Sequence, residues 1–184
     1  MIGISYFPIG LRWQSFSIEG TGTYRAREGD LLRRMEHILA DWEDTPYRDG
    51  QSVKGMGTYC TAFLCAVLDE LYRRPVPTPL PEIPTDAAMH DRATAIEGLR
   101  WFLRHYPNHE KVECMIVQPG DVLVTGPRGG GPGHGILVGP RENTLWQCSG
   151  GSVHFTGMSL PDPYELYAVY RFTDRISWLS NSAS

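Results

Sequence analysis

Two residues of this sequence could together form a nucleophile and its base. Cys60 stands directly before apolar residues at helical spacing, and His134 opens the apolar segment HGILVG. A thiolate is a strong nucleophile, and the free N–H groups and dipole of a helix N-terminus favour the ionised thiol. The same N–H groups could bind the oxyanion of a tetrahedral intermediate. The pair therefore predicts acyl transfer through a thiol nucleophile.

A hairpin brings a third residue close to the base. If residues 140–143 (PREN) form a four-residue loop, Ile136 pairs with Gln147. His134 and Gln147 then lie on one face of the sheet, diagonal to each other. We expect the Gln147 carbonyl to accept a hydrogen bond from Nδ1 of His134, which leaves Nε2 for the thiol. A register slip of one residue would make His154 the orienting group instead.

The remaining thiols are expected to be small buried hydrophobes, as free cysteines usually are: Cys65, Cys114 and Cys148. The six histidines show neither HExxH nor zinc-finger spacing, and no CxxC pair occurs. We therefore expect no metal and no cofactor. Four cysteines in 184 residues do not make a disulfide-rich chain, which favours a reducing compartment.

The order of elements predicts an α+β domain. Apolar residues at spacings of three and four predict helices, and later segments rich in β-branched and aromatic residues predict strands. The helices are expected over 28–42, 60–74 and 86–106, and the strands over 112–117, 121–125, 134–139, 144–148, 152–156 and 165–173. The nucleophile helix would then pack with the other helices on a C-terminal antiparallel sheet.

Segments rich in glycine and proline separate these elements. Residues 44–59 form the loop that leads to the nucleophile, and five prolines within 75–84 predict an extended connection. The glycines of 129–133, just before the base, suit either a mobile lid or a tight turn. The chain is expected to divide into an N-terminal extension (1–24), one domain (25–176) and a tail (177–184).

Composition and charge exclude several classes of protein. The 17 basic and 21 acidic residues are spread along the chain and give a net charge of -4, so we expect no nucleic-acid partner. No apolar run approaches the roughly 20 residues of a membrane span. The first ten residues carry no cationic leader. We therefore expect no signal peptide, synthesis in the cytoplasm and no membrane span.

Two segments resemble the NlpC-type papain-like cell-wall cysteine peptidases. WEDTPYRDGQSVKGMGTYCTAFLCAVLDELY is similar to their nucleophile region, where a helix and TPYxxGG precede DCSG or DCLG. PGDVLVTGPRGGGPGHGILVGPRENTLWQC is similar to their second half, where a strand beginning with GD precedes the base histidine and a polar orienter follows. The resemblance spans roughly 28–148 and implies a papain-like fold. It makes Cys60 the nucleophile, His134 the base and Gln147 the orienter, and it places Tyr47 in the site.

The sequence departs from the family pattern around the nucleophile. Tyr59 and Thr61 stand where the family has Asp and then Ser or Leu, and Asp49 replaces the first glycine of TPYxxGG. In cell-wall members that Asp and Ser help to hold the free amine of the stem peptide. The candidate substrate or oxyanion residues here are Tyr47, Tyr59 and Thr61.

The resemblance implies a hydrolase of amide bonds in peptidoglycan stem peptides. The sequence is most similar in pattern to peptidases of phage tails and gene-transfer particles, which act on the cell wall from an assembled particle. The expected partners are a peptidoglycan peptide and other particle or tail proteins. Two alternatives stay open: an acyltransferase, deamidase or thioesterase on the same fold, and a structural particle protein without turnover.

Overall fold

The computed structural model describes residues 12–13, 22–72, 92–106, 109–112, 116–157, 159–160 and 163–172. Its helices are α1 (Gly22–Trp42), α2 (Cys60–Leu71) and α3 (Arg92–His105). Its strands are β1 (Arg12–Trp13), β2 (His109–Lys111), β3 (Ile116–Val117), β4 (Val122–Pro127), β5 (His134–Val138), β6 (Thr144–Ser149), β7 (Ser152–Gly157) and β8 (Tyr164–Phe172).

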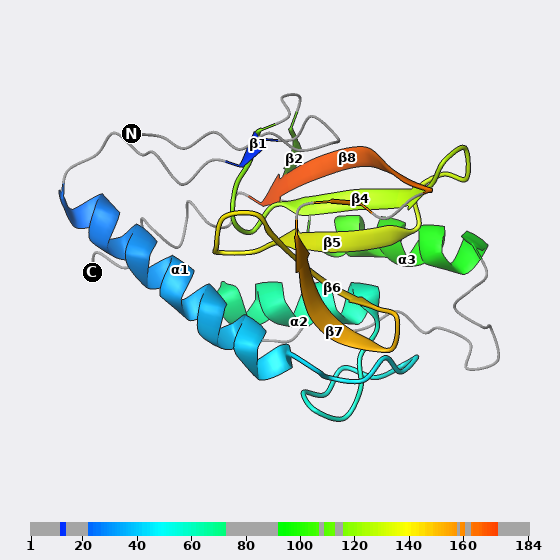
Figure 1. Cartoon of the computed structure of the whole chain (residues 1–184), viewed down its shortest axis with the longest axis horizontal. Helices are drawn as coiled ribbons and strands as arrows, with labels where there is room; N and C mark the ends of the chain where they lie inside the picture. Colours follow the sequence, from blue (N-terminus) through cyan, green and yellow to red (C-terminus); the bar gives the residue numbers. More distant parts are fainter. Residues whose placement is uncertain are drawn as a thin grey trace.

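Six of these strands form one antiparallel sheet in the order β2-β8-β4-β5-β6-β7. β1 and β3 pair in parallel outside it. The helix α2 packs against β5 and β6 and also contacts α1 and α3, so it lies at the centre of the helical layer (Figure 1). The predicted α+β architecture, with helices packed on a later antiparallel sheet, is confirmed.

The sheet buries apolar side chains on both faces. Val122, Val124 and Leu137 join the helices in the main core, together with buried residues such as Phe63 and Phe102. The alternate strand residues point the opposite way and form a second cluster: Val117, Leu123, Ile136, Val138, Leu145 and Val169. A strand that is covered on both faces has apolar residues at successive positions, as the sequences HGILVG and DVLV do.

A glycine lets α2 approach β5 closely. A Cβ at Gly135 would lie 2.5 Å from Cδ1 of Leu64, far inside van der Waals contact. Gly135 follows His134 directly, and Leu64 lies one helical turn after Cys60. The close approach of the two backbones therefore brings the candidate base and nucleophile to the same place. A glycine inside an apolar strand is the sequence signal for such packing.

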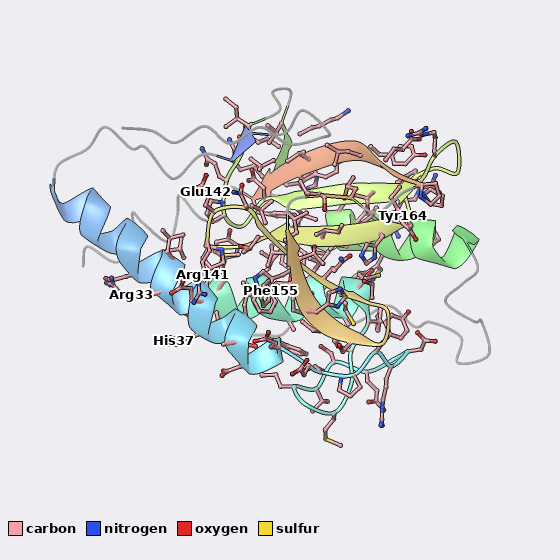
Figure 2. The ribbon with its side chains drawn as sticks, in the orientation of Figure 1. Arg33, His37, Arg141, Glu142, Phe155 and Tyr164 are labelled. Carbon is pink, nitrogen blue, oxygen red and sulfur yellow. The ribbon has the colours of Figure 1, made fainter. Side chains whose placement is uncertain are left out.

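The β5–β6 hairpin has the register that pairs Ile136 with Gln147. Leu137 pairs with Trp146 and Val138 with Leu145. At its turn, Arg141 forms an ion pair with Glu36 of α1, 3.0 Å between Nε and Oε1, and Figure 2 shows Arg141 reaching toward that helix. The hairpin is thus tied to the helical layer as well as to the sheet.

Two helix boundaries and one strand differ from the prediction. α1 begins at Gly22 instead of 28, inside the expected extension, because the first residues, GTYRARE, carry no apolar residues at helical spacing. α2 ends at Leu71 instead of 74, since Pro75 has no N–H to bond the Leu71 carbonyl. β2 was not predicted, because its HEK sequence is polar; it lies at the edge of the sheet.

The five strands from β4 to β8 begin and end within two residues of the predicted bounds. The predicted strand over 112–117 is observed only at Ile116–Val117, and 113–115 lie outside the described residues. The proline-rich connection, the start of the third predicted helix and the tail also lie outside them. No helix within the described ranges is long and apolar enough to cross a membrane.

A buried ion pair joins β3, β4 and β8. The Asp121 side chain is 1% exposed and accepts hydrogen bonds from Nε and Nη2 of Arg171 at 3.0 and 2.8 Å. It also accepts one from the Gln118 N–H, and Arg171 donates to the Ile116 carbonyl. Removing one partner of a buried, hydrogen-bonded pair leaves the other charge uncompensated. Removing either partner alone should therefore destabilise the fold.

We predict that Asp121→Asn lowers the free energy of unfolding by about 1.5–3 kcal/mol, since the partly exposed Arg171 would lose the charge of the carboxylate to which it donates. Urea unfolding of the full chain measures this. The matched control is Asp30→Asn, because Asp30 pairs with Arg33 on the exposed face of α1 and should cost less than about 1 kcal/mol. Equal small effects of both substitutions would contradict the assignment.

Candidate active site

α2 begins at Cys60 without a side-chain cap. Tyr59 is the N-cap residue, with an extended backbone (φ −135°, ψ 170°) and no capping hydrogen bond from its side chain. The Phe63 N–H donates to the Tyr59 carbonyl at 2.8 Å. The N–H groups before Phe63 have no partner within the helix, as at any helix start. They remain available to a sulfur anion or an oxyanion beside Cys60.

The Cys60 thiol interacts with the imidazole of His134, the first residue of β5. Burial by itself raises the pKa of the Cys60 thiol, but the hydrogen bond and the charge of His134 outweigh it, and the pKa is lowered. Burial by itself lowers the pKa of His134, while the contact with Cys60 raises it above its usual value. The arrangement therefore favours a thiolate paired with an imidazolium.

Gln147 of β6 completes a series of three side chains. Its amide oxygen accepts a hydrogen bond from Nε2 of His134 at 2.9 Å, and Gln147 is only 8% exposed. The nitrogen that meets Gln147 is therefore Nε2 and not the expected Nδ1. Strand alternation fixes the face on which a side chain lies, whereas rotation of the ring decides which nitrogen meets which partner.

His154, the alternative orienter, makes a different contact. It pairs with Gln147 across β6 and β7, but its Nδ1 donates to the Ser152 carbonyl in its own strand at 3.0 Å. The residue that holds the His134 ring is therefore Gln147.

Tyr47 lies beside the nucleophile in the loop that precedes α2. Its N–H donates to the Gly151 carbonyl, and its backbone forms a parallel bridge with Thr58. Burial and the nearby Cys60 raise the pKa of the Tyr47 hydroxyl, and so does the nearby Asp49. The phenol therefore stays protonated.

Tyr59 and Thr61 flank the nucleophile but do not line an open surface. Tyr59 is fully buried, and its hydroxyl has no hydrogen-bond partner among the described residues. The expected substrate contact by Tyr59 is therefore not available in this structure. Thr61 is 5% exposed, and its Oγ1 lies 3.9 Å from the Cys60 sulfur.

The other described thiols, Cys65 and Cys148, are buried and form no disulfide. The Cys148 thiol donates to the Thr58 carbonyl, and burial together with the nearby Cys60 raises the pKa of Cys148 to about 12. It therefore stays protonated, unlike Cys60. Cys114 lies outside the described residues. In the described part of the chain, no three His, Cys, Asp or Glu side chains are grouped so that they could hold a metal ion.

The glycine-rich segment before His134 is tied to β8 by hydrogen bonds. The Gly131 N–H donates to the Tyr167 hydroxyl at 2.7 Å, and the Gly129 N–H donates to the Glu165 carboxylate at 3.1 Å. A Cβ at Gly126 would lie 2.1 Å from the Gly131 carbonyl oxygen, so this glycine permits the tight crossing. In this structure residues 128–130 form a turn. It fixes the backbone from which the His134 side chain projects.

The helical layer, the six-stranded antiparallel sheet and a thiol at the start of the central helix define an NlpC-type papain-like fold. The solved structure of NlpC2 from Trichomonas vaginalis is similar to this chain, with a TM-score of 0.50 and 10% sequence identity. The similarity covers 85% of this chain and 48% of that one, so this chain spans about half the length of the solved protein. At this identity the similarity shows the fold alone. No family model and no curated protein match the sequence.

The site predicts how alkylation of Cys60 depends on pH. Only the thiolate reacts, and the pKa of Cys60 is lowered, so iodoacetamide should modify Cys60 with a midpoint below that of an ordinary free thiol. In His134→Ala the imidazolium no longer opposes the effect of burial on Cys60, so the pKa of the thiol should rise. The midpoint of alkylation should rise with it, and the alkylation rate near neutral pH should fall about tenfold or more. Peptide mapping by mass spectrometry assigns the label to Cys60.

The matched control is His154→Ala, which removes a histidine from the neighbouring strand and should leave the midpoint unchanged. An equal shift in both variants would contradict the specific contact with His134.

Proposed function

We propose that this chain is a cysteine hydrolase that cleaves amide bonds in peptidoglycan stem peptides. The observation that carries the proposal is the series Cys60, His134 and Gln147 at the start of α2: His134 lowers the pKa of the Cys60 thiol, and Gln147 is hydrogen-bonded to the His134 ring. Such a series is the arrangement of a nucleophile, its base and an orienting group. The NlpC-type fold and the order of the two segments that resemble cell-wall peptidases support the choice of substrate.

In the acylation step, the Cys60 thiolate attacks the carbonyl carbon of the scissile amide. The backbone N–H of Cys60 donates to the developing oxyanion. The imidazolium of His134 gives its Nδ1 proton to the leaving nitrogen, the C–N bond breaks, and an amine departs. The products of this step are a free amine and a thioester on Cys60.

In the deacylation step, water takes the place of the amine. Nδ1 of the now neutral His134 accepts a proton from the water, whose oxygen attacks the thioester carbon. The C–S bond breaks, the carboxylic acid leaves, and the thiolate and imidazolium are restored. Gln147 accepts the Nε2 hydrogen bond throughout, which keeps Nδ1 directed at the sulfur and the substrate.

The residues next to Cys60 bear on which stem peptide is bound. Tyr59 is buried, and Thr61 lies against the sulfur, so neither takes the place of the Asp and Ser that hold the substrate amine in cell-wall members. Asp49 is exposed and close enough to Tyr47 to raise the pKa of its hydroxyl. We assign to Asp49 the contact with a cationic group of the substrate. The placement of the enzyme in a phage-like particle, with tail proteins as partners, rests on the sequence pattern and belongs to the same proposal.

The absence of an acidic residue directly before Cys60 favours a second candidate function. An acyltransferase, deamidase or thioesterase would use the same thiol and imidazole on another carbonyl substrate. The two candidates differ in substrate, so a panel of muropeptides, protein amides and thioesters separates them.

We predict that the wild-type chain cleaves a muropeptide into two fragments whose summed mass exceeds the substrate by one water, as read by mass spectrometry. Cys60→Ala should reduce this cleavage by about 10⁴ or more, because the nucleophile is lost. The matched control is Cys65→Ala, since Cys65 is a buried thiol of the same helix and is not part of the site.

Full cleavage by Cys60→Ala would overturn the proposed mechanism. Turnover of thioesters or protein amides alone would select the second candidate, and an unreactive Cys60 without turnover of any substrate would select a structural particle protein.

A further inference from the structure

Thr61 contacts the nucleophile in a way that its expected substrate role does not explain. It follows Cys60 in the first turn of α2, and its side chain is almost completely buried, with 5% exposed. The Oγ1 atom lies 3.9 Å from the Cys60 sulfur, within hydrogen-bond distance for sulfur. A buried hydroxyl needs a hydrogen-bond partner, because burial without one is unfavourable. The partner that the structure gives it is the Cys60 sulfur.

The protonation state of Cys60 settles the direction of this hydrogen bond. A neutral thiol could donate to the threonine oxygen, but a thiolate has no proton and only accepts. The contact with His134 favours the thiolate. The Thr61 hydroxyl is then the donor, and a hydrogen bond to an anion is stronger than one between neutral groups.

A glycine of α3 leaves the room in which this hydroxyl lies. A Cβ at Gly98 would lie 3.3 Å from Oγ1 of Thr61, closer than ordinary van der Waals contact. Gly98 lies inside α3, where alanine would favour the helix by about 1 kcal/mol. Glycine at position 98 is unfavourable for the helix, but it leaves the space that the Thr61 hydroxyl occupies. We take this as the reason for a glycine at this position.

We propose that Thr61 is a positioning residue for the nucleophile: its hydroxyl donates a hydrogen bond to the Cys60 sulfur, and Gly98 of α3 sets where that hydroxyl lies. The inference rests on the proposed role of Cys60 as nucleophile. It means that α3 also affects the reaction, because Gly98 of this helix positions the Thr61 hydroxyl. It also replaces a contact between Thr61 and the substrate by a contact between Thr61 and the thiolate.

The test is the pH profile of Cys60 alkylation in variants of the full chain, mapped to Cys60 by mass spectrometry. Thr61→Val keeps the branched shape and removes the hydroxyl, so the midpoint should rise and the rate at acidic pH should fall about three- to tenfold. Thr61→Ser keeps a hydroxyl and should restore the rate to within about twofold of wild type. A purely structural role would not predict this rescue.

Gly98→Ala tests the link to α3 without changing Thr61. The added methyl should displace the hydroxyl and raise the midpoint, by less than Thr61→Val does. The control is Gly157→Ala, because a Cβ at Gly157 would meet no atom within 4 Å and should leave the midpoint unchanged. Circular dichroism confirms folding of each variant. If Thr61→Val does not fold, the alkylation midpoints of Gly98→Ala and Gly157→Ala are compared, and the proposal holds only if the first is higher.

A folded Thr61→Val with the wild-type midpoint, or a Gly98→Ala profile identical to that of Gly157→Ala, would overturn the proposal. Alkylation needs no substrate. A chain that fails to cleave muropeptides but shows the Thr61 effect would therefore overturn the proposed function alone, and the reverse result would overturn the inference alone.

Discussion

The contact between the Cys60 sulfur and the His134 imidazole depends on two elements that are far apart in sequence. The thiol lies at the start of the central helix, and the imidazole lies at the first residue of a strand. Burial disfavours the charged form of each group, so neither would ionise readily alone. Together they stabilise a thiolate and an imidazolium. The reactivity of the site is therefore a property of the helix–sheet interface rather than of either residue.

Much of the surrounding structure can be understood as support for that interface. Gly135 allows α2 and β5 to approach, and the turn held by Tyr167 fixes the backbone just before His134. The loop before Cys60 is held from the other side, because Lys54 forms an ion pair with Glu70 at the far end of α2. Each of these contacts restricts one of the segments that carry reacting groups, which is how a site is preorganised.

Much of the site could be predicted from sequence because it depends on spacing. Apolar periodicity located the nucleophile helix, and the four-residue loop 140–143 set the strand register that brings Gln147 near His134. Spacing could not give the orientation of the imidazole ring, since that depends on side-chain rotation. Nor could it reveal that Tyr59 is buried or that Thr61 touches the sulfur, because both follow from packing against distant segments. The strand signal was also missing for polar β2, whose pairing with β8 depends on tertiary context.

The most direct test of the ion pair is ¹⁵N NMR of the His134 ring across pH, in the wild-type chain and in Cys60→Ala. The structure predicts that the wild-type imidazolium persists above the ordinary histidine pKa of about 6.5, with Nε2 hydrogen-bonded to Gln147. In Cys60→Ala the pKa should fall, because burial is then no longer opposed by the thiolate. The same His134 pKa in both proteins would contradict the account.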